Sequence, residues 1–268
     1  MAGYSRRFIG MKLFVFQLIV VVGVVGDALA KDPYFFSVSI KDCIEAERKL
    51  EAYEKGKLSL QDLNEKAGEE GCKQLIGYYL LHTNDISPKA KLPISRCYAA
   101  FAMYPDVVKL ASEYVSVYSN DWHGWRILGT AYDLMNSSTK SINAYSNAVR
   151  LGDTKSYESL AGVALKNHQP EIVRDLVPKL IALKDGKQTP RDNKLNVISI
   201  LLFYSIDADR KDVFIRTLEG EDMKDMLSND MIKKNIMTGC KRFEGLEIDV
   251  IRHELEAAIQ RESKSVGE

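Results

Sequence analysis

One stretch of the sequence constrains the fold most strongly, because large and very small residues alternate in it at helical spacing. Four residues fall at positions i, i+3, i+4 and i+7, on one face of a helix: Trp125, Leu128, Gly129 and Tyr132. Gly129 has no side chain, so a second helix can approach closely there. The matching face of that second helix consists of Ser141, Tyr145 and Ala148. The segment 122–153 therefore predicts two antiparallel helices with these residues between them.

This segment resembles a tetratricopeptide repeat (TPR), whose first helix carries W-x-x-L-G-x-x-Y and whose period is about 34 residues. Gly152 and Asp153 stand where a TPR usually ends in proline, as in Sel1-like repeats, but the longer glycine-containing loop of those repeats is missing. The resemblance implies an all-α fold, a right-handed superhelical solenoid of antiparallel helix pairs. In TPR proteins such a solenoid binds other proteins.

Neighbouring repeats are expected, because one repeat cannot bury its own apolar faces. The pattern returns in weaker form in the helices that contain Tyr157 and Leu195, and upstream around Val115. We therefore expect degenerate repeats flanked by capping helices, with Ile248, Ile251, Leu255 and Ile259 as the apolar stripe of the last one. The predicted segments are a signal peptide (1–30), an N-terminal helical cap region (31–87), TPR-like repeats (88–223), C-terminal capping helices (224–262) and a frayed tail (263–268).

The N-terminal residues have the pattern of an export signal. Arg6, Arg7 and Lys12 precede an apolar run over 13–26, and Ala28-Leu29-Ala30 supplies the small residues of a cleavage site. The run is shorter than the roughly 20 apolar residues of a membrane-spanning helix, so a retained anchor is the weaker alternative. We expect a periplasmic or secreted protein, cleaved near Ala30.

Export makes disulfides permissible for the four cysteines. Cys43 and Cys72 come abreast if 39–55 and 59–80 form an antiparallel hairpin, so a Cys43–Cys72 bridge is predicted. The states of Cys97 and Cys240 stay open. C-x-x-C spacing is missing from the sequence, which argues against a zinc site and against thioredoxin-like chemistry.

Signals of catalysis are missing from the sequence. It holds four histidines and no H-E-x-x-H, G-x-S-x-G, Walker A or dinucleotide-binding pattern, so we predict no enzyme activity, catalytic residue, metal or cofactor. Lys plus Arg number 37 and Asp plus Glu number 37, so no net basic charge favours nucleic acid.

The TPR resemblance implies a binding groove. In TPR proteins the first helices line a concave face that receives an extended peptide or a helix, and Arg126 is the first residue we expect to bind a partner here. Trp125 and Tyr132 are expected in the core instead. The groove residues carried over by position are His123, Arg126, Thr130, Asp133, Lys155, Glu158, Lys166, Asn193 and Asn196.

The sequence thus favours an exported TPR-type protein–protein interaction module. We expect a periplasmic scaffold or adaptor in envelope assembly, secretion or pilus machinery, and association with a membrane complex is left open. A periplasmic holdase chaperone for unfolded clients is the alternative, and a peptidoglycan-active helical enzyme is less favoured. The partner is not identified by the sequence.

Overall fold

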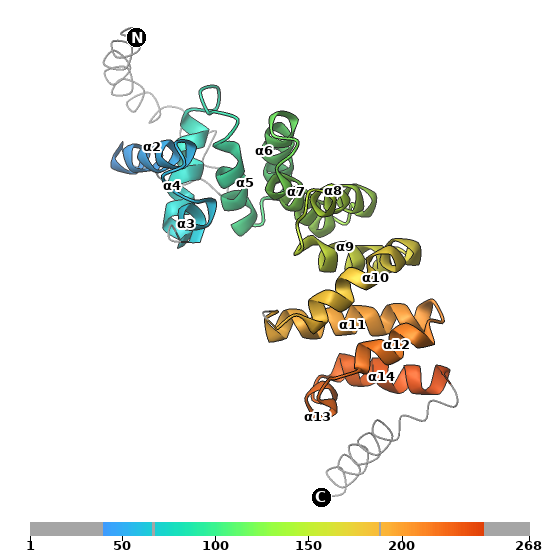
Figure 1. The fold of residues 1–268 in the computed structure, drawn as a ribbon. Helices are drawn as coiled ribbons and strands as arrows, with labels where there is room; N and C mark the ends of the chain where they lie inside the picture. Colours follow the sequence, from blue (N-terminus) through green and yellow to red (C-terminus); the bar gives the residue numbers. More distant parts are fainter. Residues whose placement is uncertain (1–39, 66–67, 188, 244–268) are drawn as a thin grey trace, which may run out of the picture. The chain divides into compact units, whose positions relative to one another are not determined.

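The computed structural model describes residues 40–65, 68–187 and 189–243. These residues form 13 α-helices and no strand, which confirms the all-α expectation (Figure 1). None of the helices in these ranges combines the length and the apolar composition that a bilayer-crossing helix needs. The predicted signal peptide, the stripe Ile248, Ile251, Leu255 and Ile259, and the tail lie outside the described residues. The chain divides into two compact units, Met1–Ile86 and Ser87–Glu268.

Three helices are described in the first unit: α2 (Ile40–Glu54), α3 (Leu60–Glu65) and α4 (Gly68–Leu81). The second arm of the predicted hairpin is therefore divided, and α4 begins at Gly68, whose φ of 59° is strained for any residue with a side chain. The buried apolar side chains come from all three helices: Ala46, Leu50 and Tyr53, then Leu63, then Cys72, Leu75, Ile76 and Tyr79.

The predicted Cys43–Cys72 bridge is wrong, because Cys43 carries a free thiol. Cys72 and Cys97 are the disulfide-bonded cysteines, and Cys240 is also free. The first turn of α2 meets α4 beyond Cys72, where Gln74 Nε2 donates to Asp42 Oδ1 at 2.9 Å. Burial raises the pKa of the Cys43 thiol, and Asp42 and Glu47 raise it further, so this thiol is a poor nucleophile.

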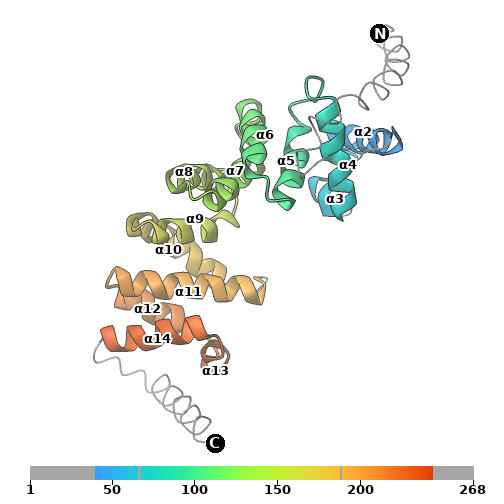
Figure 2. The same cartoon turned by 180° about the vertical axis from the view of Figure 1, so that it is seen from behind.

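The second unit is a repeat-like series of helix pairs. The first helix of each pair packs on the second, and each pair packs on the next. The pairs are α5 (Lys91–Ala100) with α6 (Tyr104–Val117), α7 (Trp122–Leu134) with α8 (Ser138–Arg150), α9 (Ser156–Lys166) with α10 (Pro170–Asp185), and α11 (Arg191–Asp207) with α12 (Lys211–Leu218). The short α13 (Met223–Leu227) and α14 (Asp230–Arg242) follow, and α11, α12 and α14 lie side by side in both ribbon views (Figures 1 and 2).

The same turn joins the two helices in every pair. Its middle residue is left-handed, with φ between 54° and 56°, and is not glycine in any of them: Ala102, Asn136, His168 and Asp209. The residue after it donates its N–H back to a carbonyl in the last turn of the first helix, as Ser137 does to Tyr132 at 2.8 Å and Arg210 does to Ser205 at 2.7 Å. Four occurrences of one turn give this series of helix pairs its repeat-like character.

The contacts of α7 explain the glycines of the sequence motif. A Cβ atom on Gly129 would lie 2.6 Å from Cδ1 of Tyr145, and one on Gly124 would lie 2.6 Å from Cγ1 of Val115. Ser141 Oγ also donates to the backbone oxygen of Gly129 at 2.9 Å. Both neighbouring helices therefore approach α7 at positions where it has no side chain.

Two residues of the predicted repeat core lie elsewhere. Leu128, Tyr145 and Ala148 are buried, but Trp125 and Tyr132 are half-buried at the surface. The ring of Trp125 instead donates Nε1–H to the backbone oxygen of Ser119 at 2.8 Å. The large residue that fills the space at Gly129 is Tyr145, so the small residue is on the first helix and the large one on the second.

We expect Gly129→Ala to lower the free energy of unfolding by about 1–3 kcal/mol, because the Tyr145 ring must be displaced. Gly162→Ala is the matched control, since a Cβ on Gly162 meets no atom within 4 Å and alanine favours a helix. Urea unfolding followed by the fluorescence of Trp122 and Trp125 measures both changes. Equal effects of the two substitutions would contradict the close contact.

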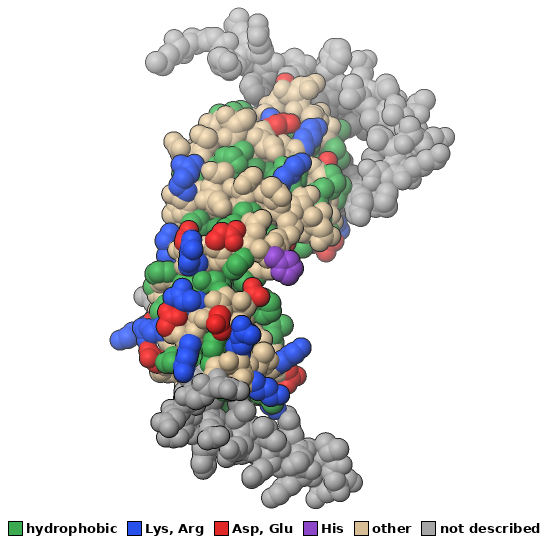
Figure 3. Space-filling model, turned by 90° about the vertical axis from the view of Figure 1, so that its right-hand side faces the viewer, with side chains coloured by type: hydrophobic (Ala, Val, Ile, Leu, Met, Phe, Trp, Pro, Cys, Tyr) green, Lys and Arg blue, Asp and Glu red, His purple; other side chains and the backbone are tan. Residues whose placement is uncertain are grey.

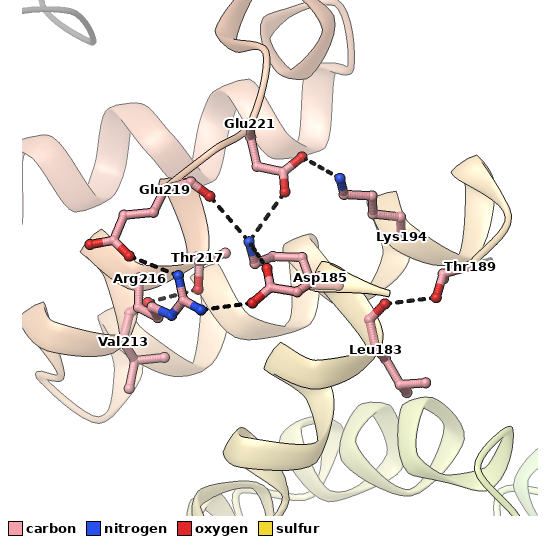
Figure 4. Close-up of polar contacts among 10 residues, drawn as sticks. Leu183, Asp185, Thr189, Lys194, Val213, Arg216, Thr217, Glu219 and Glu221 are labelled. Atoms are coloured by element: carbon pink, nitrogen blue, oxygen red, sulfur yellow. Dashed lines mark hydrogen bonds and ion pairs between the residues drawn. The ribbon is translucent and has the colours of Figure 1, made fainter. Parts of the chain in front are cut away.

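A buried lysine joins the last turn of α10 to the loop after α12 (Figure 4). The side chain of Lys184 is 0% exposed, and its Nζ lies 2.7 Å from Asp185 Oδ1 and 3.2 Å from Glu221 Oε1. Outer cations complete the network: Arg216 contacts Asp185 at 2.7 Å, and Lys194 contacts Glu221 at 2.9 Å. The charge of Lys184 is thereby balanced, so burying it is tolerable.

Lys184→Met should destabilise the protein by about 3 kcal/mol, at the low end for a broken buried pair because Arg216 and Lys194 still contact the two carboxylates. Lys211→Met, at the exposed start of α12, should change stability by less than about 0.5 kcal/mol. The two urea midpoints provide the comparison. If both variants match the wild type, the buried network contributes nothing to stability.

Candidate functional site

The candidate site is an open cleft in the second unit, between α9, α11 and the start of α14. Its volume is about 410 Å³. Polar and apolar side chains mix in its lining, which suits recognition of a chain that carries both. The lining residues are Glu158, Ser159, Leu195, Asn196, Ser199, Ile200, Asn229, Met231 and Ile232.

The packing of α11 explains why its lining residues are accessible. One side of this helix is buried against α9 and α10 through residues that include Val197 and Leu201. Another side is buried against α12 and α14 through Ile198 and Leu202. A strip remains between them, in which Asn196 is exposed and Ile200, one turn later, is partly buried at the edge of the first side. Phe203, 49% exposed, follows in the next turn.

The far wall of the cleft begins with the cap of α14. The side-chain oxygen of Asn229 accepts the N–H groups of Met231 at 3.1 Å and Ile232 at 3.2 Å, so Asn229 starts the helix. Ile232 is buried, whereas Met231 is 65% exposed beside the cleft. The cap therefore holds a flexible apolar side chain opposite α11.

Glu158 is the carboxylate among the lining residues. It is half-buried on the first turn of α9, near the side chain of Asn196. Burial raises the pKa of Glu158, and the polar amide of Asn196 offsets only part of the effect. Within the described residues, no lysine, arginine or histidine forms an ion pair with it.

Arg126, the residue first expected to bind a partner, is held within the chain. Its Nη1 lies 3.2 Å from Asp153 Oδ1, and the Asp153 side chain is 3% exposed. Its guanidinium also lies 4.6 Å from the ring centroid of Trp122. Arg126→Glu would set a carboxylate against a buried one, so this substitution cannot separate binding from folding. A role for Arg126 in partner binding stays a prediction.

Of the other predicted groove residues, Glu158 and Asn196 line the cleft and the rest do not. Asp133 pairs with Lys166 at 3.8 Å, and the Thr130 hydroxyl accepts from Tyr145 Oη at 3.1 Å. Lys155 and Asn193 are exposed near the starts of their helices. Sequence reasoning missed the wall formed by Asn229 and Met231, for which the N-cap pattern at Asn229-Asp230 was the available signal.

His123, also predicted for the groove, belongs to a cap at the start of α7. Asp121 accepts from the backbone N–H of His123 at 3.0 Å and from Tyr114 Oη at 2.5 Å, and lies 2.8 Å from His123 Nδ1. Burial alone raises the pKa of Asp121, but the hydrogen bonds from His123 and Tyr114 outweigh it and lower the pKa from 3.8 to about 2.

Because the pKa of Asp121 is lower in the folded state, its carboxylate stabilises the fold above pH 3.8, and this contribution is lost as the pH falls toward about 2. Asp121→Asn keeps a capping side chain but cannot titrate. We expect the wild type to lose stability relative to Asp121→Asn across this range. Urea midpoints measured at several pH values test this, with exposed Asp192→Asn as control, and parallel curves for all three proteins would contradict it.

In the part of the chain that the structure describes, no group of three or more histidine, cysteine or acidic side chains is arranged to hold a metal ion. Comparison with known protein families gives no match for this chain, and no curated protein matches it either. The candidate site is therefore interpreted from its own geometry.

Proposed function

We propose that this protein is a TPR-type scaffold that binds a segment of a partner protein in the cleft between α9, α11 and α14. The observation that carries the proposal is the strip of α11 that the core leaves uncovered, where amide, hydroxyl and apolar groups line one cleft. Such a surface can bind a peptide backbone and its side chains together.

The helix arrangement supports the TPR-type part of the proposal. The first helices contact one another in succession, α5 with α7, α7 with α9, and α9 with α11. The left-handed turn residues Ala102 and Asn136 are one TPR period apart, about 34 residues. Stacked first helices would form the continuous face on which TPR proteins bind their partners, and we propose a right-handed superhelical solenoid for these repeats.

The proposal includes export through the predicted signal peptide, so the partner would be a protein of the cell envelope or the secreted fraction. Envelope assembly, secretion and pilus machinery all require adaptors of this kind. Figure 3 shows acidic and basic side chains mixed over the lower part of the face it presents. Mixed charges favour a specific protein partner over a polyanion.

A holdase chaperone is the second candidate function. It is favoured by large apolar side chains that are about half exposed or more in both units, among them Leu80, Leu134 and Met231. These residues are scattered, whereas a chaperone for unfolded clients would use a continuous apolar surface. We therefore rank the adaptor first.

Photo-crosslinking in the native cell separates the two functions. A photoreactive amino acid replaces Phe203, beside the cleft, or Asp175, exposed on α10. For an adaptor we expect one main adduct from position 203 and none from position 175. Ser199→Trp, which fills the cleft, should abolish that adduct without changing the urea midpoint.

Many adducts from both positions, unchanged by Ser199→Trp, would favour the holdase and contradict the adaptor. The absence of an adduct from position 203, with the protein at its normal level, would contradict binding in the cleft.

A further inference from the structure

We infer that the cleft selects a peptide segment in which a lysine or arginine lies next to an apolar side chain, and that Glu158 binds the basic group. The inference rests on the proposed function, since it specifies the chemistry of the partner at the same cleft. Its basis is the set of ion pairs and hydrogen bonds that the polar side chains of the cleft form within the described residues, and those that they leave unformed.

The charge of Glu158 is not balanced within the described residues. Lysines on the same two helices have other contacts: Lys166, at the far end of α9, pairs with Asp133, and Lys194 on α11 pairs with Glu221 at 2.9 Å. Lys155 is one turn earlier on the chain, yet no ion pair joins it to Glu158. The arrangement differs from Asp153, which is buried, and Glu221, which is largely buried, since each of these carboxylates meets a cation of the chain. An incoming ammonium or guanidinium would supply the missing partner.

Apolar surface lies beside this carboxylate. Ile200 is one turn beyond Asn196, which lines the cleft with Glu158, and Met231 stands on the other wall. A flexible methionine adapts to side chains of several shapes. A basic residue can therefore place its charged end at Glu158 while an adjacent apolar side chain contacts Ile200 and Met231.

The amide side chains provide groups for the peptide backbone. Asn196 lines the α11 wall of the cleft, and the oxygen of its side-chain amide can accept a backbone N–H. Asn229 uses its oxygen to cap α14, which leaves its amide nitrogen as a donor. One donor and one acceptor on opposite walls suit a chain that runs between them.

The charges that line the cleft indicate how many charged residues the bound peptide should have. Among the residues that the structure describes, Glu158 is the only charged one that lines the cleft, so one basic residue satisfies it and a polybasic segment gains nothing further there. An acidic residue in the same position would be repelled by a half-buried carboxylate. We therefore expect selection for a single Lys or Arg and against Asp and Glu.

The experiment selects binders from a random linear peptide library against the purified wild-type protein, Glu158→Gln, Glu158→Lys and Asp133→Asn. Asp133→Asn is the matched control, because Asp133 is also an acid on a first helix but already pairs with Lys166. We expect the wild type and Asp133→Asn to enrich peptides with one basic residue beside an apolar one. Glu158→Gln should lose the basic preference, and Glu158→Lys should enrich acidic peptides.

An enriched peptide is then resynthesised with its basic residue replaced by glutamine. Its affinity for the wild type, measured by fluorescence anisotropy, should fall on the order of tenfold, and its affinity for Glu158→Gln should hardly change. Enriched peptides without a basic preference, blocked by Ser199→Trp, would overturn this inference and leave the proposed function standing. Enrichment of no peptide by the wild type would contradict both.

Discussion

The contact between the Tyr145 ring and the bare backbone of Gly129 determines how closely α7 and α8 pack. With a side chain at position 129 the ring would have to move, since a Cβ there would lie 2.6 Å from it. The Tyr145 hydroxyl also bonds Thr130, and Ser141 bonds the Gly129 carbonyl, so polar groups fix the register that the glycine permits. Gly239 repeats the device in α14, where the ring of Phe214 occupies the space of the missing side chain. Close helix pairs are the unit from which the rest of this part of the chain is built.

The cleft is a consequence of stacking such pairs. A helix in the middle of the stack is buried by the pair before it and by the elements after it, so α11 must be apolar on two sides. Residues in the strip between these two sides are less needed for packing, so they can be polar and bind a partner. Asn196, Ser199 and Ile200 occupy this strip on α11, and Glu158 and Ser159 reach the same space from the preceding first helix. The architecture thus places polar side chains from distant parts of the sequence in one cleft without any dedicated loop.

Local pattern predicted much of the fold and part of the site. Helical spacing around Gly129 predicted the central pair, because close packing leaves a signal in neighbouring residues. Glu158 and Asn196 were predicted for a groove and line the cleft together. Arg126 was predicted for the same groove, but its contact with Asp153 depends on a loop 27 residues later that spacing cannot place. The wall around Asn229 and the free Cys43 were missed for the same reason: each depends on how separate helices meet. The sequence around Lys184 is typical of an exposed lysine. Its burial depends on contacts with the loop after α12, which is distant in the sequence.

Charged side chains of the second unit that are paired within the chain suit stability, whereas Glu158, which forms no ion pair with the described residues, suits binding. Lys184 and Asp153 are buried, and each has partners within the chain, because an unbalanced charge in the interior would cost several kcal/mol. Glu158 is less buried, and its polar neighbour Asn196 carries no charge, so the chain tolerates a carboxylate whose charged form burial disfavours. A glutamine would avoid the cost of desolvating a charge at this position. A carboxylate at this position is therefore better explained by a cation that arrives with a partner than by the needs of the fold.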